Sequence, residues 1–215
     1  MPLSIKDGQT IVFIGDSITD CGRRTTERPL GNGYVKLFSD LLTMREPAKR
    51  LTIINRGIGG DKVPGLRNRW TDDVIRNKPD WLSVKVGIND LHAYLRQTPE
   101  AVPPELFEEA YNDIMSRTRD ELPDCRILLI DPFYLSRDRS PQSFRKLVLD
   151  TMPQYLDTVH AMSERYGTRL VRTHEVFQRL LEHHDPNEFC PEPVHPYLNG
   201  HLVIAEAVYA ALSEA

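Results

Sequence analysis

Short apolar runs alternate along the chain with longer segments of mixed character. Five of these runs have the length of buried β-strands and end near glycine, proline or polar residues. They cover Thr10 to Ile14, Leu51 to Asn55, Trp81 to Val86, Arg126 to Asp131 and Arg169 to Arg172. Such nearly continuous apolar runs are typical of parallel strands, which are covered on both faces.

The segments between the runs have helical periodicity. The clearest spans Glu105 to Leu122, between Pro103-Pro104 and Pro123, where prolines mark both ends of the helix. Its apolar stripe repeats every four residues, at Leu106, Ala110, Ile114 and Thr118. A further helix is expected from about Leu198 onward, and we expect loops at 98–104 and 185–196.

Strands that alternate with helices predict right-handed crossovers and a parallel sheet. We therefore expect an α/β fold, a three-layer αβα sandwich around a five-stranded parallel sheet. The sequence shows neither a Gly/Ser-rich linker nor an internal repeat, so residues 1–215 are predicted to form a single domain.

Charge and cysteine content exclude several classes of protein. A formal net charge of −4 argues against nonspecific nucleic-acid binding. No stretch approaches the roughly 20 apolar residues of a membrane span, and the N-terminus does not resemble a signal peptide, so we expect a cytoplasmic protein without membrane contact. Cys21, Cys125 and Cys190 are odd in number and lack CxxC spacing, which favours reduced thiols over disulfides or zinc.

The first candidate for chemistry follows the first apolar run, where Gly15-Asp16-Ser17 comes directly after Ile14. A strand that ends in this way presents the Ser17 hydroxyl at the carboxyl edge of the sheet, where open α/β sheets bind ligands. Serine is a weak nucleophile and needs a base and an oxyanion site. Ser17 is therefore a candidate nucleophile only if the chain supplies both.

Two polar turns follow the next two strands. Gly57 to Gly60 come after the second, where glycines allow backbone N–H groups to approach a ligand. A dinucleotide fingerprint would need glycine at the position of Lys62 and is a poor fit. Asn89 follows the third strand, and its amide can donate to an oxyanion together with the amides of Ser17 and Gly60.

The candidate base lies near the C-terminus, in the segment Cys190 to Pro196. Three prolines restrict this loop and bias Glu192 and His195 away from helical geometry. A carboxylate three residues before an imidazole can accept from one ring nitrogen, which leaves the other to take the serine proton.

Other polar and aromatic residues have simpler interpretations. We expect Asp16, Asp20 and Asp90 to hydrogen-bond local backbone, and His92 and Tyr94 to line the substrate pocket. His183-His184-Asp185 are expected to form a solvated helix end, so no metal site is predicted. His201 is expected at the start of the last helix. Trp70 and Trp81 are expected to be core or interface anchors.

The four segments, in this order, resemble the GDSL or SGNH hydrolase superfamily. The longer strings Phe13 to Arg23, Lys78 to Trp81 and Asp131 to Tyr134 are similar to its bacterial acetylxylan esterase-like branch. The resemblance implies a flavodoxin-like SGNH hydrolase fold. It also implies Ser17 as nucleophile and His195 as general base and acid. The oxyanion hole would comprise Ser17, Gly60 and Asn89.

The activity implied is that of a serine esterase without cofactors, acting on short-chain, above all acetyl, esters of carbohydrates or other alcohols. Its partner would be a small-molecule ester, and a homo-oligomer is compatible with the sequence. The family pattern has Asp where this chain has Glu192. Because glutamate can orient a histidine in other serine hydrolases, Glu192 is expected to complete the triad, with a backbone carbonyl as the alternative. Two alternatives stay open: a thioesterase or lysophospholipase, and a catalytically silent carbohydrate-binding relative.

Overall fold

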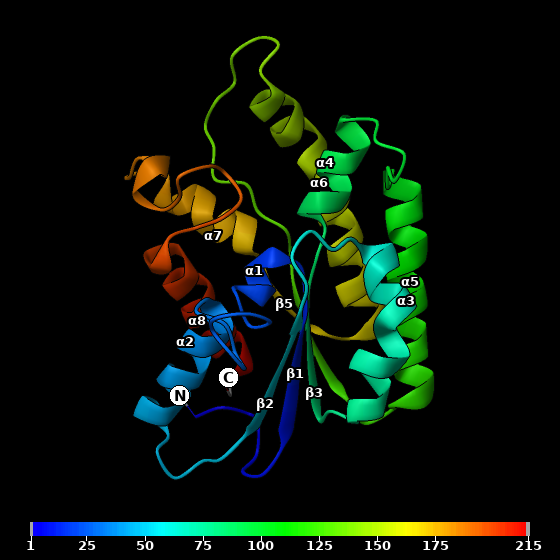
Figure 1. The fold of residues 1–215 in the computed structure, drawn as a ribbon, viewed down its shortest axis with the longest axis vertical. Helices are drawn as coiled ribbons and strands as arrows, with labels where there is room; N and C mark the ends of the chain where they lie inside the picture. Colours follow the sequence, from blue (N-terminus) through cyan, green and yellow to red (C-terminus); the bar gives the residue numbers. More distant parts are fainter. Residues whose placement is uncertain (1, 214–215) are drawn as a thin grey trace.

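The computed structural model describes residues 2–213, and its centre is a five-stranded parallel sheet of order β2-β1-β3-β4-β5 (Figure 1). This confirms the predicted α/β fold. The strands are β1 (Thr10–Gly15), β2 (Thr52–Gly57), β3 (Trp81–Lys85), β4 (Arg126–Ile130) and β5 (Arg169–Val171). All five expected runs form strands, with ends that differ by one or two residues because pairing with neighbours decides where a strand stops.

Helices cover both faces of the sheet, which gives the predicted three layers (Figure 1). The helices are α1 (Ser17–Asp20), α2 (Tyr34–Arg45), α3 (Val63–Asp73), α4 (Ile88–Leu95), α5 (Pro104–Glu121), α6 (Phe144–Tyr166), α7 (Thr173–Leu180) and α8 (Leu198–Leu212), with short 3₁₀ turns η1 (Ile75–Asn77) and η2 (Pro186–Glu188). On one face α2 packs against α8, and on the other α5 packs between α3 and α6.

Two expected loops are partly helical. The segment 98–104 ends inside α5, whose first residue is Pro104, because proline lacks an N–H that the first helical turn would leave unpaired anyway. The segment 185–196 contains η2, which the Asp185 and Glu188 side chains cap reciprocally. Both differences arise at a helix start, from a proline at the first position of α5 and from a capping box at η2.

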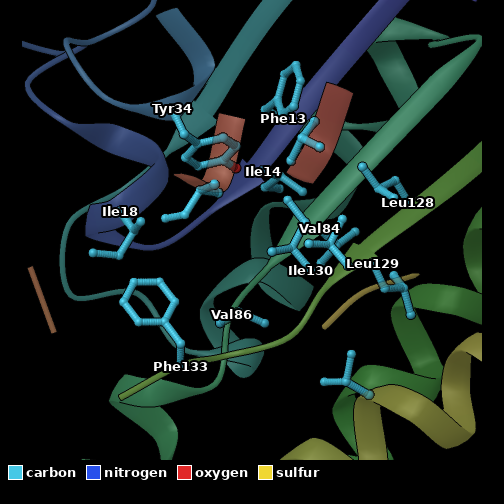
Figure 2. Close-up of a cluster of buried hydrophobic side chains, with 14 of the residues drawn as sticks. Phe13, Ile14, Ile18, Tyr34, Val84, Val86, Leu128, Leu129, Ile130 and Phe133 are labelled. Carbon is cyan, nitrogen blue, oxygen red and sulfur yellow. The ribbon is translucent and has the colours of Figure 1, made fainter. Parts of the chain in front are cut away.

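The core lies on both faces of the central strands. Side chains from β1, β3 and β4 meet there with Ile18 of α1 and Tyr34 of α2 (Figure 2). Trp70 and Trp81 are fully buried, as predicted for core anchors. β2, one of the two edge strands, is only partly buried, whereas β1 and β3 are buried along nearly their whole length.

Between residues 2 and 213, no helix combines the length and the apolar character required to cross a bilayer. The buried apolar residues form one connected cluster that draws on strands and helices from Leu3 to Leu212. The topology also aligns the carboxyl ends of three strands, because Gly15 pairs with Gly57 on one side and with Lys85 on the other. The turns that follow β1, β2 and β3 therefore meet at one edge.

Candidate active site

Ser17 begins the one-turn helix α1 directly after β1. The preceding residue, Asp16, caps this turn, since its Oδ1 accepts from the amide of Ile18 at 3.0 Å. The other oxygen of Asp16 lies 3.5 Å from Nζ of Lys85, and both side chains are buried. Asp16 therefore fixes the turn that presents Ser17. Its negative charge is balanced by the positive charge of Lys85 on β3.

The glycine before Asp16 is required by a close approach of two strands. A Cβ on Gly15 would lie 2.2 Å from the carbonyl oxygen of Lys85 and 2.6 Å from Oγ1 of Thr19. The Lys85 carbonyl could make room for such a Cβ only if β3 moved. The glycine thus lets β1 turn sharply into α1 at the edge where Ser17 must lie.

The structure brings Ser17 and His195 together across the chain. Oγ of Ser17 lies 2.9 Å from Nε2 of His195, and Nδ1 of His195 lies 2.5 Å from Oε1 of Glu192. The proline-rich segment before α8 places both residues here. The amide of Leu135 ties that segment to the loop after β4 by donating to the carbonyl of Pro193 at 2.8 Å.

Glu192 is bound to its own loop as well as to the imidazole. Its Oε1 also accepts from the amide of His195 at 2.8 Å, and its Oε2 accepts from the amide of Val194 at 3.0 Å. Partial burial acts to raise the pKa of Glu192, but the bonds from Val194 and His195 outweigh it and hold that pKa below its ordinary value. Glu192 is therefore an ionised acceptor for His195 near neutral pH.

Three donors face the same edge. The amides of Ser17 and Gly60 donate to no acceptor within residues 2–213, and Gly60 has a φ of 81°, which favours glycine. Nδ2 of Asn89 gives one hydrogen to the carbonyl of Asp61 at 3.0 Å, so its second N–H stays available. These groups have the chemistry that an oxyanion hole needs.

Two further aspartates tether the loop that carries Gly60. Oδ2 of Asp20 accepts from the amide of Gly59 at 2.9 Å, and Oδ1 of Asp90 accepts from the amide of Val63 at 2.9 Å. Asp90 is fully buried, its other oxygen has no protein partner within the described chain, and burial raises its pKa to about 7. Both side chains thus bind the backbone of a loop that is distant in sequence, by 39 residues from Asp20 and 27 from Asp90, rather than the local backbone expected from the sequence.

His92 and Tyr94 occupy different environments on α4. His92 is half-buried, packs against the rings of Tyr134 and Phe144, and has a pKa of about 4, lowered first by burial and then by Arg96. It is therefore neutral near pH 7. Tyr94 is exposed. Its place in the substrate pocket stays a prediction.

Lys85 is the residue of this region that the sequence interpretation missed. It lies within the predicted strand from Trp81 to Val86, yet its Nζ lies 3.5 Å from Asp16 and 4.9 Å from the centre of the Phe133 ring. A lysine inside a predicted buried strand indicates that an oppositely charged partner lies nearby, because a buried charge needs one.

The side chains of the remaining histidines and cysteines make no hydrogen bond to the side chains of Ser17, Glu192 or His195 within residues 2–213. His184 pairs with Glu188 beyond α7, and residues 2–213 contain no cluster of His, Cys, Asp and Glu suited to a metal. His201 lies in the first turn of α8, as predicted, with Nε2 3.4 Å from Sγ of Cys21. Burial raises the pKa of Cys21 to about 12, so this thiol is a poor nucleophile.

Fold and site geometry together define a hydrolase of the SGNH fold, with a serine at the carboxyl edge of its parallel sheet. The chain belongs to the GDSL-like lipase/acylhydrolase family of carboxylic ester hydrolases, whose sequence profile matches residues 13–203. This confirms the resemblance found in the sequence. One relative, an acetylxylan esterase of Geobacillus stearothermophilus, is 32% identical over 222 residues, which cover 95% of this chain and 94% of the relative.

Solved structures are similar over almost the whole chain. Axe2, an acetylxylan esterase from Geobacillus stearothermophilus, matches with a TM-score of 0.88 and 32% identity over 99% of this chain and 98% of its own. LAE5, an α/β hydrolase enzyme from the metagenome of Lake Arreo, Spain, matches with a TM-score of 0.87 and 32% identity over 97% and 96%. Catalytic mutants of Axe2 replace a serine, an aspartate or a histidine by alanine.

Proposed function

We propose that this protein is a serine esterase that removes acetyl groups from carbohydrates through an acyl-enzyme on Ser17. The observation that carries the proposal is the hydrogen-bonded chain from Ser17 Oγ to His195 Nε2 at 2.9 Å and from His195 Nδ1 to Glu192 Oε1 at 2.5 Å. This is the arrangement that activates a serine hydroxyl, with glutamate in the place of the orienting acid.

In the first half-reaction Ser17 Oγ attacks the acetyl carbonyl carbon while His195 Nε2 takes the hydroxyl proton. The carbonyl oxygen becomes an oxyanion and accepts from the amides of Ser17 and Gly60 and from Asn89 Nδ2. Collapse of the tetrahedral intermediate breaks the bond to the sugar oxygen. His195 returns its proton to that oxygen, so the sugar leaves as an alcohol and the acetyl group stays on Ser17.

In the second half-reaction water attacks the acetyl-enzyme. His195 takes a proton from the water as its oxygen bonds to the carbonyl carbon, and the same donors hold the oxyanion. The bond to Ser17 Oγ then breaks, the serine regains its proton from His195, and acetate leaves. Throughout, Glu192 keeps the ring in one orientation and stabilises its charged form.

A cavity that includes Gly60, but neither Ser17 nor His195, in its lining has room for a hydroxylated substrate. It holds about 600 Å³ between the Gly60 loop, α3 and the loop before α5. Val102 and Leu106 give it an apolar wall, whereas Asn68 and an ion pair of Lys62 with Glu100 at 2.7 Å make part of its lining polar. A sugar ring has both apolar faces and hydroxyl groups, so it fits such a lining.

The relatives' acetylxylan esterase activity makes acetylated xylo-oligosaccharides the first substrates to test. We expect acetate release from them, a preference for nitrophenyl acetate over the octanoate ester, and no activity in Ser17→Ala. The same screen should include acyl thioesters and lysophospholipids. A preference for either, or for octanoate, would overturn the substrate assignment, and full activity of Ser17→Ala would overturn the mechanism.

Several smaller proposals accompany this function. The side chains and amides named above suffice for hydrolysis, so a chelator should leave the rate unchanged. We also propose that residues 1–215 act as one domain in the cytoplasm. Expression of the isolated chain, cell fractionation and light scattering would test the domain, the location and the oligomeric state.

A further inference from the structure

Four arginines line a hollow at the outer edge of the sheet. It holds about 450 Å³ and lies where β2 faces the segment after α1. The guanidinium groups come from two places in the chain, and the apolar side chains of β2 complete the lining. Its members are Arg23, Arg24, Arg28, Pro29, Ile53, Ile54, Asn55 and Arg56. We call it the arginine pocket.

Several guanidinium nitrogens of this pocket have no acceptor within residues 2–213. Arg23 is half-buried and donates only through Nε, to the carbonyl of Gly57 at 2.7 Å. Arg24 donates only through Nε, to Oδ2 of Asp20 at 3.0 Å. The terminal nitrogens of both are therefore available. Arg56 Nε is buried without a hydrogen bond, since its nearest carboxylate oxygen, on Asp73, is 3.6 Å away.

The carboxylates nearby do not neutralise the arginines. Asp20 pairs with Arg24, but Asp73 is shared, because it also pairs with Arg69 at 2.6 Å. Arg28 donates to the carbonyl of Arg24 and, within the described chain, pairs with no carboxylate. The pocket therefore carries an excess of positive charge in a protein whose net charge is −4. Partly desolvated guanidinium groups in this state favour an anion with several oxygen acceptors.

We propose that the arginine pocket binds a small oxyanion, a carboxylate or phosphate group. Planar guanidinium groups pair in a bidentate way with either. The pocket adjoins the candidate active site through two contacts: Arg23 holds the carbonyl of Gly57, and Asp20 joins Arg24 to the amide of Gly59. If the proposed esterase function holds, the anion is a uronate branch of the carbohydrate substrate; otherwise it is a free anion such as phosphate.

Binding is tested first, without catalysis. Calorimetric titration of the whole protein with inorganic phosphate and with glucuronate should show saturable binding of at least one. Arg23→Gln and the more exposed Arg28→Gln should each weaken it about tenfold, the usual effect of one lost charge-assisted hydrogen bond. Arg139→Gln, an exposed arginine paired with Asp150, is the matched control and should bind as the wild type does.

Absence of saturable binding for both probes, or equal binding by Arg23→Gln and Arg28→Gln, would overturn the proposal. Because this titration does not depend on hydrolysis, its failure is distinct from a failure of the esterase assignment. Steady-state kinetics then distinguish an anionic group on the substrate from a free anion. A lower ratio of kcat/KM for uronate-bearing over neutral acetylated oligosaccharides in Arg28→Gln identifies the substrate, and an unchanged ratio with weakened phosphate binding identifies a free anion.

Discussion

Replacement of Glu192 by glutamine is the most direct test of how His195 is oriented. The carboxylate accepts three hydrogen bonds, from the imidazole and from the amides of Val194 and His195. An amide of the same size keeps one acceptor oxygen and turns the other into a donor. At least one of the three bonds must therefore be lost, and the negative charge beside the imidazole disappears.

The size of the effect follows from the exposure of the pair. A charge-assisted hydrogen bond contributes about 1.5–3 kcal/mol. The side chains of His195 and Glu192 are 58% and 45% exposed, so water screens their interaction. We expect kcat to fall by about 10- to 100-fold, since each 1.36 kcal/mol changes a rate about tenfold. The loss of about 10⁴-fold found for a buried orienting aspartate in a serine protease sets the upper limit.

The assay is steady-state hydrolysis of nitrophenyl acetate, with Ser17→Ala as the inactive reference. Glu192→Asp keeps the charge and should retain more activity than Glu192→Gln. Glu182→Gln makes the same charge change at an exposed position on the protein and serves as the matched control. Wild-type kcat in Glu192→Gln would refute the reasoning and would indicate that a backbone carbonyl orients His195 instead.

Three substitutions test the surroundings of the site by chemical denaturation. Gly15→Ala should lose about 3 kcal/mol or more of unfolding free energy, because its Cβ would lie 2.2 Å from a backbone oxygen; a loss below about 1 kcal/mol would contradict the close approach. Lys85→Met should cost about 3–5 kcal/mol by leaving Asp16 charged and buried, and unchanged stability would show that the pair is dispensable. Asp90 has a folded pKa of about 7 against 3.8 unfolded, so its own contribution to wild-type stability should be full below about pH 4 and fall as the pH rises to about 7. Asp90→Asn should remove this slope, and a slope that persists would point to another group.

Much of the fold could be predicted because its signals are local. The apolar runs that become β1 and β3 are buried on both faces, so their pattern is nearly continuous and is readable without any partner. Pro186 and the capping residue Asp185 also act locally, within the single turn of η2. This turn could not be predicted, because a three-residue helix is too short to show a periodic pattern.

The candidate site was predictable only as a set of residue types at strand ends. Ser17, Asn89 and His195 each follow an element boundary, and their order along the chain carried the family resemblance. The role of Lys85 could not be found in this way, because its partner Asp16 lies 69 residues earlier and only the register of β1 against β3 brings the two together.

The sequence by itself determined the strands, the alternation of strands with helices and the candidate reacting groups, since these depend on side-chain pattern and short-range geometry. Only the tertiary structure decided that Ser17 and His195, 178 residues apart, come within 2.9 Å, and that glutamate reaches the imidazole where the family pattern has aspartate. It also decided that four arginines share one pocket. Such contacts arise from sheet order and helix packing, which join distant segments and leave no periodic trace along the chain.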